Sequence, residues 1–200
     1  MQFAEFPKPL DYTLTYFKKA AMDEGSIGEI EPSESWTDEV LNWGTEEDQE
    51  RAREMRTNKG YTWLRKGRAI GPILGGCLSS IVHLRGTEYW PSHKGTILLL
   101  EIPEGHDFSQ GEPLEAVDSY LTDLKLSNVF DEIVGLVFGR PFRYIEEDTE
   151  KLKAVILENT KEYDFPILFG VDVGHTDPQI TVPLGALVEI NSENNLFKIQ

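Results

Sequence analysis

The sequence has 200 residues, with 35 acidic and 19 basic side chains and a formal net charge of −16. This length is sufficient for a buried core, and the charge argues against nonspecific binding to nucleic acid or anionic membranes, which needs a basic face. Cys77 is the only cysteine, so no internal disulfide can form. No run approaches the roughly 20 apolar residues of a membrane span, and residues 1–6 lack the features of a signal peptide. We therefore expect a reduced, cytoplasmic protein that contacts neither nucleic acid nor membrane.

The first third of the chain is predicted to contain a short helix, a short strand and a polar segment. Asp11 is the expected N-cap of a short helix over 12–22, and residues 27–30 favour a short strand. Residues 33–60 are the most polar part, in which 45–55 favour a solvated turn or short helix. Trp36 lies in this polar part, where it either anchors a loop or stacks on a ligand.

The middle of the chain alternates between apolar runs and amphipathic segments. Residues 61–73 are strand-like but interrupted at Gly67 and Gly71, residues 74–77 are predicted as a tight turn, and 78–84 as a short helix. Buried strands are expected over 96–102, 132–139 and 165–171, with helices over 113–126 and 148–159 between them. Residues 180–199 predict a hairpin that turns at 191–195. The alternation indicates one α/β domain over residues 1–200 with a mainly parallel central sheet.

Several common catalytic motifs are missing. The sequence has no Gly-x-Ser-x-Gly elbow, no P-loop, no Gly-x-Gly-x-x-Gly and no zinc-ligand pattern. Cys77 precedes a predicted helix, which could activate its thiol, although a small packing residue is the simpler interpretation.

Among the four histidines, His175 has the most suggestive position. His83 falls in an apolar helical stretch that predicts packing, whereas His93 and His106 fall in turn sequences that predict exposure. His175 follows the last buried strand directly after Gly174. Ligands of open α/β sheets bind just beyond the carboxyl ends of the strands, so His175 is either functional or a hydrogen-bonded turn residue.

Glu101 occupies a matching position at the end of another buried strand. A carboxylate at this edge could bind the Nδ1 proton of an imidazole and stabilise the imidazolium. The alternative is a solvated strand end. Glu104, three residues later in a Pro-Glu-Gly turn, is a second candidate for the same role.

These residues lie in segments that resemble the LD-carboxypeptidases, a family of serine peptidases that includes murein tetrapeptide and microcin C immunity (MccF-type) carboxypeptidases. The resemblance rests on residues 71–78, 84–91, 95–101, 135–140 and 174–185, in this order and with compatible spacing. It covers most of the chain and corresponds to the C-terminal half of the family's proteins. It implies a three-layer, swivelling β/β/α-like domain, and residues 10–39 are more similar to the microcin-immunity branch.

The resemblance also implies a catalytic set of Ser, Glu and His. It makes His175, in Gly-His-Thr-Asp-Pro, the general base and Glu101 its partner, with no metal and no cofactor. Gly75 and Gly76 would shape the pocket wall near His175, and Trp36 would stack on a nucleobase of the substrate. The family's serine lies in a Gly-Tyr-Ser-Asp elbow, and none of the serines here has that context.

We therefore expect the chain to be a C-terminal domain whose partner is an N-terminal serine-bearing domain. The expected substrate is a small peptide or an aminoacyl nucleotide: an LD-peptide bond of a muropeptide or the acyl-sulfamoyl adenylate of processed microcin C. The family often forms dimers, which leaves a homodimer open. One alternative is a noncatalytic ligand-binding or dimerisation domain. Another is a cysteine hydrolase that uses Cys77 with His175.

Overall fold

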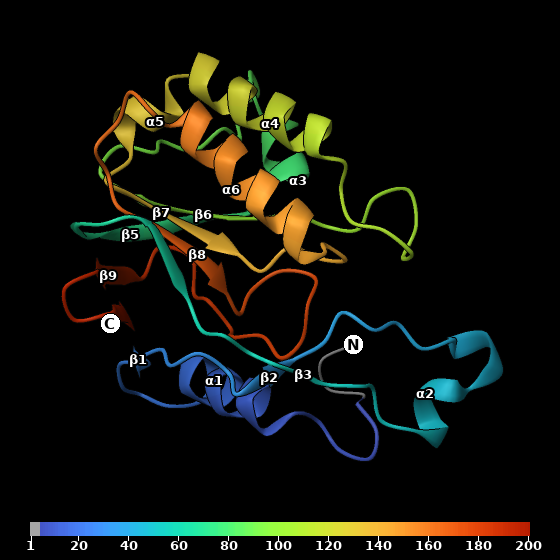
Figure 1. Ribbon diagram of the computed structural model, residues 1–200. Coiled ribbons are helices and arrows are strands. Elements are labelled where there is room, and N and C mark those ends of the chain that lie inside the picture. The colour runs from blue at the N-terminus through green and yellow to red at the C-terminus, as the bar shows by residue number, and fades with distance from the viewer. Residues whose placement is uncertain (1–4) are drawn as a thin grey trace.

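The computed structural model describes residues 5–200, so part of the N-terminal segment predicted not to be a signal peptide lies outside the described residues. A mixed eight-stranded sheet crosses the molecule in the order β1-β10-β9-β5-β6-β7-β8-β4 (Figure 1). Its strands are β1 (Gly28–Glu29), β4 (Thr62–Arg65), β5 (Arg68–Cys77), β6 (Ile97–Glu101), β7 (Gly135–Gly139), β8 (Ile167–Val171), β9 (Leu187–Asn191) and β10 (Leu196–Ile199). Within the described residues, no helix is long and apolar enough to cross a membrane.

The centre of the sheet is parallel, as the sequence predicts. Strands β5, β6, β7 and β8 pair in parallel, while β4, β9, β10 and β1 add antiparallel edges. The three apolar runs expected as buried strands form β6, β7 and β8, whose residues are nearly all buried. The predicted α/β class with a mainly parallel central sheet is confirmed.

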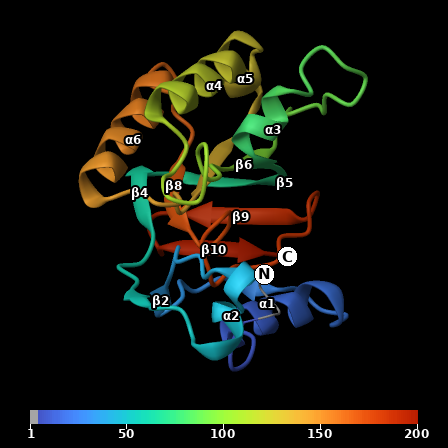
Figure 2. The same cartoon turned by 90° about the vertical axis from the view of Figure 1, so that its right-hand side faces the viewer.

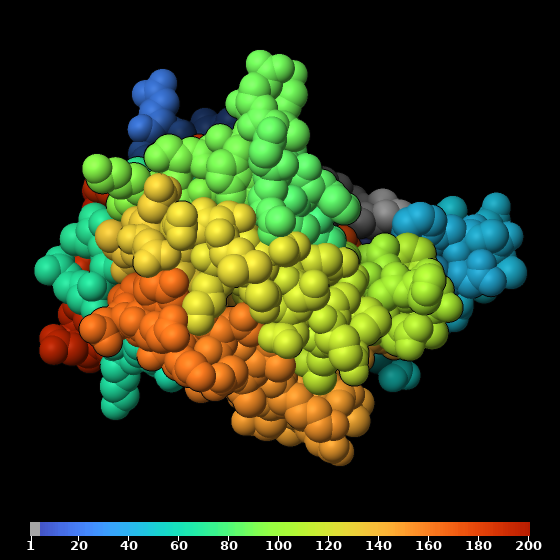
Figure 3. Space-filling model, turned by 90° about the horizontal axis from the view of Figure 1, so that it is seen from above, coloured from blue at the N-terminus to red at the C-terminus, as the bar shows by residue number. Residues whose placement is uncertain are grey.

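A layer of helices covers one face of this sheet (Figures 1 and 3). It consists of α3 (Leu78–Val82), α4 (Leu114–Leu126), α5 (Val129–Glu132) and α6 (Glu146–Asn159). Leu98 and Leu100 of β6 pack on this side against the apolar stripe of α4, which includes Leu121 and Leu124. The intervening Leu99 belongs to the opposite core, as the alternation of a strand requires.

The other face is covered by the N-terminal helix and by the curled antiparallel end of the sheet (Figure 2). Helix α1 (Asp11–Ala21) contributes Tyr16 to a second apolar cluster with Ile27, Ile30 and Phe197. The helix begins one residue before its predicted start, with Leu10 rather than Asp11 at the N-cap. The polar part contains β2 (Ser35–Trp36), β3 (Arg56–Thr57), the 3-10 helix η1 (Trp43–Thr45) and α2 (Glu47–Glu50).

The prediction of a turn at residues 74–77 is wrong, because these residues complete β5 and pair with β6 from Leu74 to Cys77. Paired glycines are typical of turns, but here they allow a close approach between strands. A Cβ on Gly75 would lie 1.8 Å from the carbonyl oxygen of Leu99, so only glycine fits. Gly71 likewise does not interrupt the strand, since its hydrogen atoms face Gly95, whose carbonyl oxygen would lie 2.4 Å from an added Cβ.

Candidate active site

His175 and Glu101 meet at the carboxyl edge of the parallel strands. Glu101 is the last residue of β6, and His175 lies in the loop after β8. The Nδ1 atom of His175 lies 2.8 Å from Oε2 of Glu101. Glu101 is buried, with 7% of its surface exposed, whereas the imidazole side chain is 39% exposed. A buried carboxylate therefore fixes one ring nitrogen of a histidine whose other side remains accessible.

This contact controls the charge of the imidazole. The hydrogen bond to Glu101 raises the pKa of His175 above its ordinary value, and the charges of Glu101 and Glu104 add to the effect, while partial burial opposes it. With Glu101 as an acceptor, the proton of the neutral ring sits on Nδ1. The Nε2 atom is then the basic nitrogen, and it lies 3.6 Å from Oε2 of Glu104.

Two glycines create the space for this pair. Gly174 has a φ of +105°, and a Cβ at this position would lie 2.7 Å from Oε2 of Glu101. At Gly139, an added Cβ would lie 2.6 Å from the carbonyl oxygen of Val173 and 3.0 Å from the Cβ of Glu101. A side chain at Gly174 would displace the Glu101 carboxylate from the imidazole, and one at Gly139 would collide with the Val173 backbone beside it.

The loop that carries His175 is anchored at its start by a fully buried carboxylate. Asp172 accepts a hydrogen bond from the Arg140 guanidinium at 2.5 Å, and from the backbone N–H and the hydroxyl of Ser33 at 2.8 and 2.9 Å. The hydroxyl groups of Tyr12 and Tyr61 also donate to it. Burial raises the pKa of both tyrosines, so they remain neutral donors.

A backbone bridge anchors the end of the same loop. Thr37 and Asp177 exchange two hydrogen bonds of 2.7 and 2.9 Å between their N–H and C=O groups. The Asp177 carboxylate also pairs with Arg53 at 2.9 Å. The polar segment therefore holds the histidine loop in place. The sequence gives no pairing signal for these contacts, since they join residues more than 100 positions apart.

A cavity of about 340 Å³ opens beside His175, within the size range of small-molecule sites. Its polar lining contains Arg53, His175 and the carboxylates of Glu5, Asp38, Glu39, Asp48, Glu104 and Asp177. Its apolar lining includes Phe6, Val40, Leu41, Trp43, Phe108 and Phe142. Within residues 5–200, no serine, threonine or cysteine lines this cavity.

The other predicted site residues lie close to this edge but outside the cavity lining. Gly76 and Cys77 are the β5 residues beside Leu100 and Glu101 of β6, and Gly75 precedes them. A Cβ added at Gly76 would have no heavy atom within 4 Å. Trp36 has two guanidinium groups over its ring, with Arg56 at 4.5 Å and Arg140 at 4.8 Å from the centroid.

The remaining histidines differ from two of the predictions. His93 is buried against Trp90, and burial lowers its pKa, so the predicted exposure is wrong. His83 is exposed rather than packed, because it follows the end of α3. His106 is exposed, as predicted. Cys77 is a free, half-buried thiol that lies 3.3 Å from the hydroxyl of Ser79.

Comparison with known proteins identifies the family. The model of the LD-carboxypeptidase C-terminal domain matches residues 70–190, the region that contains both Glu101 and His175. The chain belongs to the LD-carboxypeptidase family. A putative carboxypeptidase of Vibrio cholerae is 28% identical over 99% of this chain and 57% of its own length.

Solved structures of MccF-type family members have the same fold. An MccF-like protein from Streptococcus pneumoniae, in complex with AMP, is 28% identical, with a TM-score of 0.82 over 97% of this chain and 59% of its own. The microcin C7 self-immunity protein MccF, in complex with aspartyl sulfamoyl adenosine, is 26% identical, with a TM-score of 0.83 over 100% of this chain and 58% of its own. The chain thus spans somewhat more than half the length of the relatives that it matches.

Proposed function

We propose that this chain supplies the histidine and the glutamate of a Ser-Glu-His triad in a serine carboxypeptidase-type amide hydrolase. The observation that carries the proposal is the 2.8 Å contact between His175 Nδ1 and the buried Glu101 carboxylate, beside a cavity of substrate size. Membership of the LD-carboxypeptidase family supports the same chemistry.

The serine is expected from an N-terminal domain, to which these 200 residues would form the C-terminal partner. Two findings support this arrangement. No hydroxyl or thiol side chain of the described residues lines the cavity, and the matched relatives are longer than this chain. The backbone amides that bind the oxyanion would also come from the serine-bearing domain.

In the proposed reaction, the serine hydroxyl attacks the amide carbonyl and Nε2 of His175 takes its proton. The same proton is then transferred to the leaving amine, and water hydrolyses the acyl-enzyme with His175 again as the base. Glu101 holds the Nδ1 proton and stabilises the imidazolium that forms in each step.

The proposed substrate is a small amide: an LD-linked muropeptide or an aminoacyl-sulfamoyl nucleotide. The MccF complex with aspartyl sulfamoyl adenosine supports the second class. We propose that Trp36 stacks on the nucleobase after Arg56, which is more exposed than Arg140, moves aside. Gly76 would leave room for substrate next to Glu101. A cytoplasmic location suits this substrate and the free Cys77 thiol.

The proposal is tested by hydrolysis of an LD-tetrapeptide and of aspartyl sulfamoyl adenosine. In the full-length parent protein, His175→Ala should reduce kcat by about three orders of magnitude or more. His106→Ala is the matched control, because His106 is exposed and does not line the cavity. The 200-residue chain alone should show no turnover. Turnover by the 200-residue chain that His175→Ala abolishes would contradict the need for a second domain. Full activity of the His175→Ala parent would show that His175 is not the general base, and would favour a noncatalytic binding role for this chain.

A further inference from the structure

A second cavity adjoins the one beside His175. It has a volume of about 580 Å³ and includes Arg143 in its lining, and we call it the Arg143 cavity. The two cavities share four apolar lining residues: Val40, Leu41, Trp43 and Phe108. Neither His175 nor Glu101 lines the Arg143 cavity. It is therefore a place for a ligand group that lies next to the catalytic pair but does not touch it.

Arg143 differs from the other arginines in its lack of a partner for the ends of its guanidinium. Within residues 5–200, six of the eight arginines pair with a carboxylate. A seventh, Arg65, donates from its two Nη atoms to the backbone carbonyls of Phe165 and Thr160. The Arg143 side chain donates from Nε to the backbone carbonyl of Phe108 at 3.2 Å, and its Nη atoms have no acceptor among the described residues. These Nη atoms are available to a ligand.

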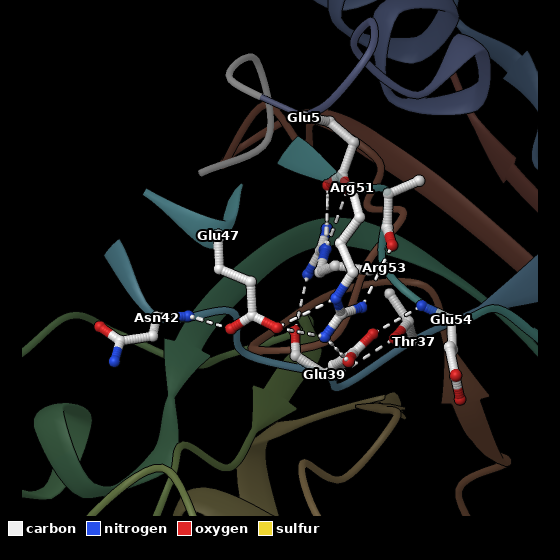
Figure 4. Close-up of polar contacts among 9 residues, drawn as sticks. Glu5, Thr37, Glu39, Asn42, Glu47, Arg51, Arg53 and Glu54 are labelled. Atoms are coloured by element: carbon white, nitrogen blue, oxygen red, sulfur yellow. Dashed lines mark hydrogen bonds and ion pairs between the residues drawn. The ribbon is translucent and has the colours of Figure 1, made fainter. Parts of the chain in front are cut away.

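The acids close to this guanidinium are already neutralised. Glu47 lines the Arg143 cavity, but its Oε1 pairs with Arg51 at 2.7 Å and its Oε2 accepts a backbone N–H at 3.1 Å (Figure 4). Asp38 accepts the backbone N–H of Arg143 at 3.1 Å, and its other oxygen pairs with Arg56. Arg143 therefore supplies the uncompensated charge of its cavity, and that charge is positive.

The backbone of Arg143 is held in an unusual conformation. Its φ is +54°, in the left-handed region that residues with side chains seldom adopt. The hydrogen bonds to Asp38 and to the carbonyl of Phe108 maintain this conformation, and the guanidinium lies 5.6 Å from the centre of the Phe142 ring. Backbone strain of this kind is concentrated at ligand-binding positions, and here it fixes the direction of a charged group.

The other walls of the Arg143 cavity indicate what accompanies the anion. The rings of Trp43 and Phe108 line it and are 56% and 52% exposed. Exposed rings of this size offer a contact surface to an aromatic or apolar group. The amide of Asn42 and the hydroxyl of Ser109 lie in the same lining and add hydrogen-bond donors next to the guanidinium.

We propose that the Arg143 cavity binds an anionic group, a carboxylate or a phosphate, on a ligand with an aromatic or apolar body. The planar guanidinium fits either anion with two parallel hydrogen bonds. Binding at this cavity does not depend on amide cleavage. Its use by a substrate rests on the proposed hydrolase, in which the cavity would select substrates whose anionic end lies across the shared apolar wall from the cleaved bond.

The test measures binding of three probes to the 200-residue chain by isothermal titration calorimetry: phenylacetate, phenyl phosphate and phenylacetamide. Phenylacetamide has nearly the shape of phenylacetate but no charge. At least one of the two anions should bind about tenfold or more tightly than phenylacetamide, and the tighter of them shows whether the site prefers a carboxylate or a phosphate. The indole N–H signal of Trp43 should shift in NMR spectra when the anion binds.

Arg143→Gln should remove this preference for an anion, whereas Trp43→Ala should weaken the binding of the anion and of phenylacetamide alike. Arg68→Gln is the matched control, because Arg68 is an exposed arginine outside both cavities and its loss should leave the affinities unchanged. Equal affinities for all three probes, no binding of any of them, or a preference that survives in Arg143→Gln would overturn the proposal.

The same measurement separates this inference from the proposed function. His175→Ala should leave the affinity for the anion unchanged, since His175 does not line the Arg143 cavity. Absence of anion binding in a chain whose full-length parent hydrolyses amides would contradict the Arg143 site alone. Anion binding by a chain whose parent shows no hydrolysis would support the Arg143 site and contradict the hydrolase.

Discussion

The helix-covered face of the sheet and the edge that carries His175 are both buried, but they are built from different side chains. Under the helices, Leu98, Leu100, Leu121 and Leu124 form an apolar cluster in which every neighbour adds dispersion contacts. At the His175 edge, the buried residues are mostly charged or hydroxylic: Ser33, Thr37, Asp38, Glu101, Arg140, Asp172, Thr176 and Asp177. The first region stabilises the fold through buried area, while the second fixes the orientation of a few polar groups.

We expect the loss of one buried charge at the His175 edge to lower the free energy of unfolding as much as a large cavity under the helices does. Asp172→Asn keeps the shape of the side chain but leaves the Arg140 guanidinium buried without its counter-charge. We expect the free energy of unfolding to fall by about 3–5 kcal/mol, measured by urea denaturation. Asp23→Asn, at an exposed site, should change little. A loss at Asp172 no larger than that of the control would show that the buried pair contributes nothing.

The apolar face can be tested with one substitution at two positions of the same helix. Leu121 is fully buried in α4, whereas Leu126, the last residue of that helix, is 75% exposed. Leu121→Ala should lower the free energy of unfolding by about 2–5 kcal/mol because it leaves a cavity, whereas Leu126→Ala should change it by about 0.5 kcal/mol or less. Neither should alter the pKa of His175. Equal losses at the two positions would contradict the assignment of α4's buried stripe.

A smaller effect is expected at the glycine next to the histidine. Gly174→Ala forces a Cβ into a positive-φ position against Glu101, and should cost about 1–3 kcal/mol in unfolding free energy. Gly185→Ala is the control, since its φ is +87° but nothing lies within 4 Å of the added Cβ. Gly174→Ala should also lower the pKa of His175, which Gly185→Ala should not. An unchanged His175 pKa in Gly174→Ala would show that the glycine does not position the pair.

The sequence was sufficient to predict the regular centre of the fold. The apolar runs that became β6, β7 and β8 are buried on both faces, so their composition alone marks them as central strands. The turn predicted at Gly75 and Gly76 is wrong because glycine occurs both in turns and where two strands approach closely. The four-residue helix α5 was too short to show a periodic pattern.

The candidate site was predictable only in its two central residues. Glu101 ends β6 and His175 follows β8, and the carboxyl ends of such parallel strands meet at one edge of a sheet. The supporting contacts depend on the path of the polar segment over that edge. No local pattern indicates that Ser33 and Thr37 contact Asp172 and Asp177.

The His175–Glu101 pair also makes stability depend on pH. The pKa of His175 is raised in the folded protein, so the protonated imidazole stabilises the fold at pH values below its unfolded pKa. This contribution is lost as the pH rises through the folded pKa. Between the unfolded-state and the folded-state pKa of His175, the free energy of unfolding should therefore decline less steeply with pH in Glu101→Gln. Urea denaturation at several pH values measures this. A decline as steep as in the unsubstituted chain would assign the pH dependence to another group.

The most direct test of the central claim, that Glu101 holds His175 as a general base, is the pKa of His175 itself. An NMR titration of its ring protons should place this pKa above the ordinary value of a histidine, and Glu101→Gln should lower it. Glu104→Gln should lower it by less, since Glu104 contributes only through its charge at 3.6 Å. A His175 pKa that Glu101→Gln leaves unchanged would contradict the claim.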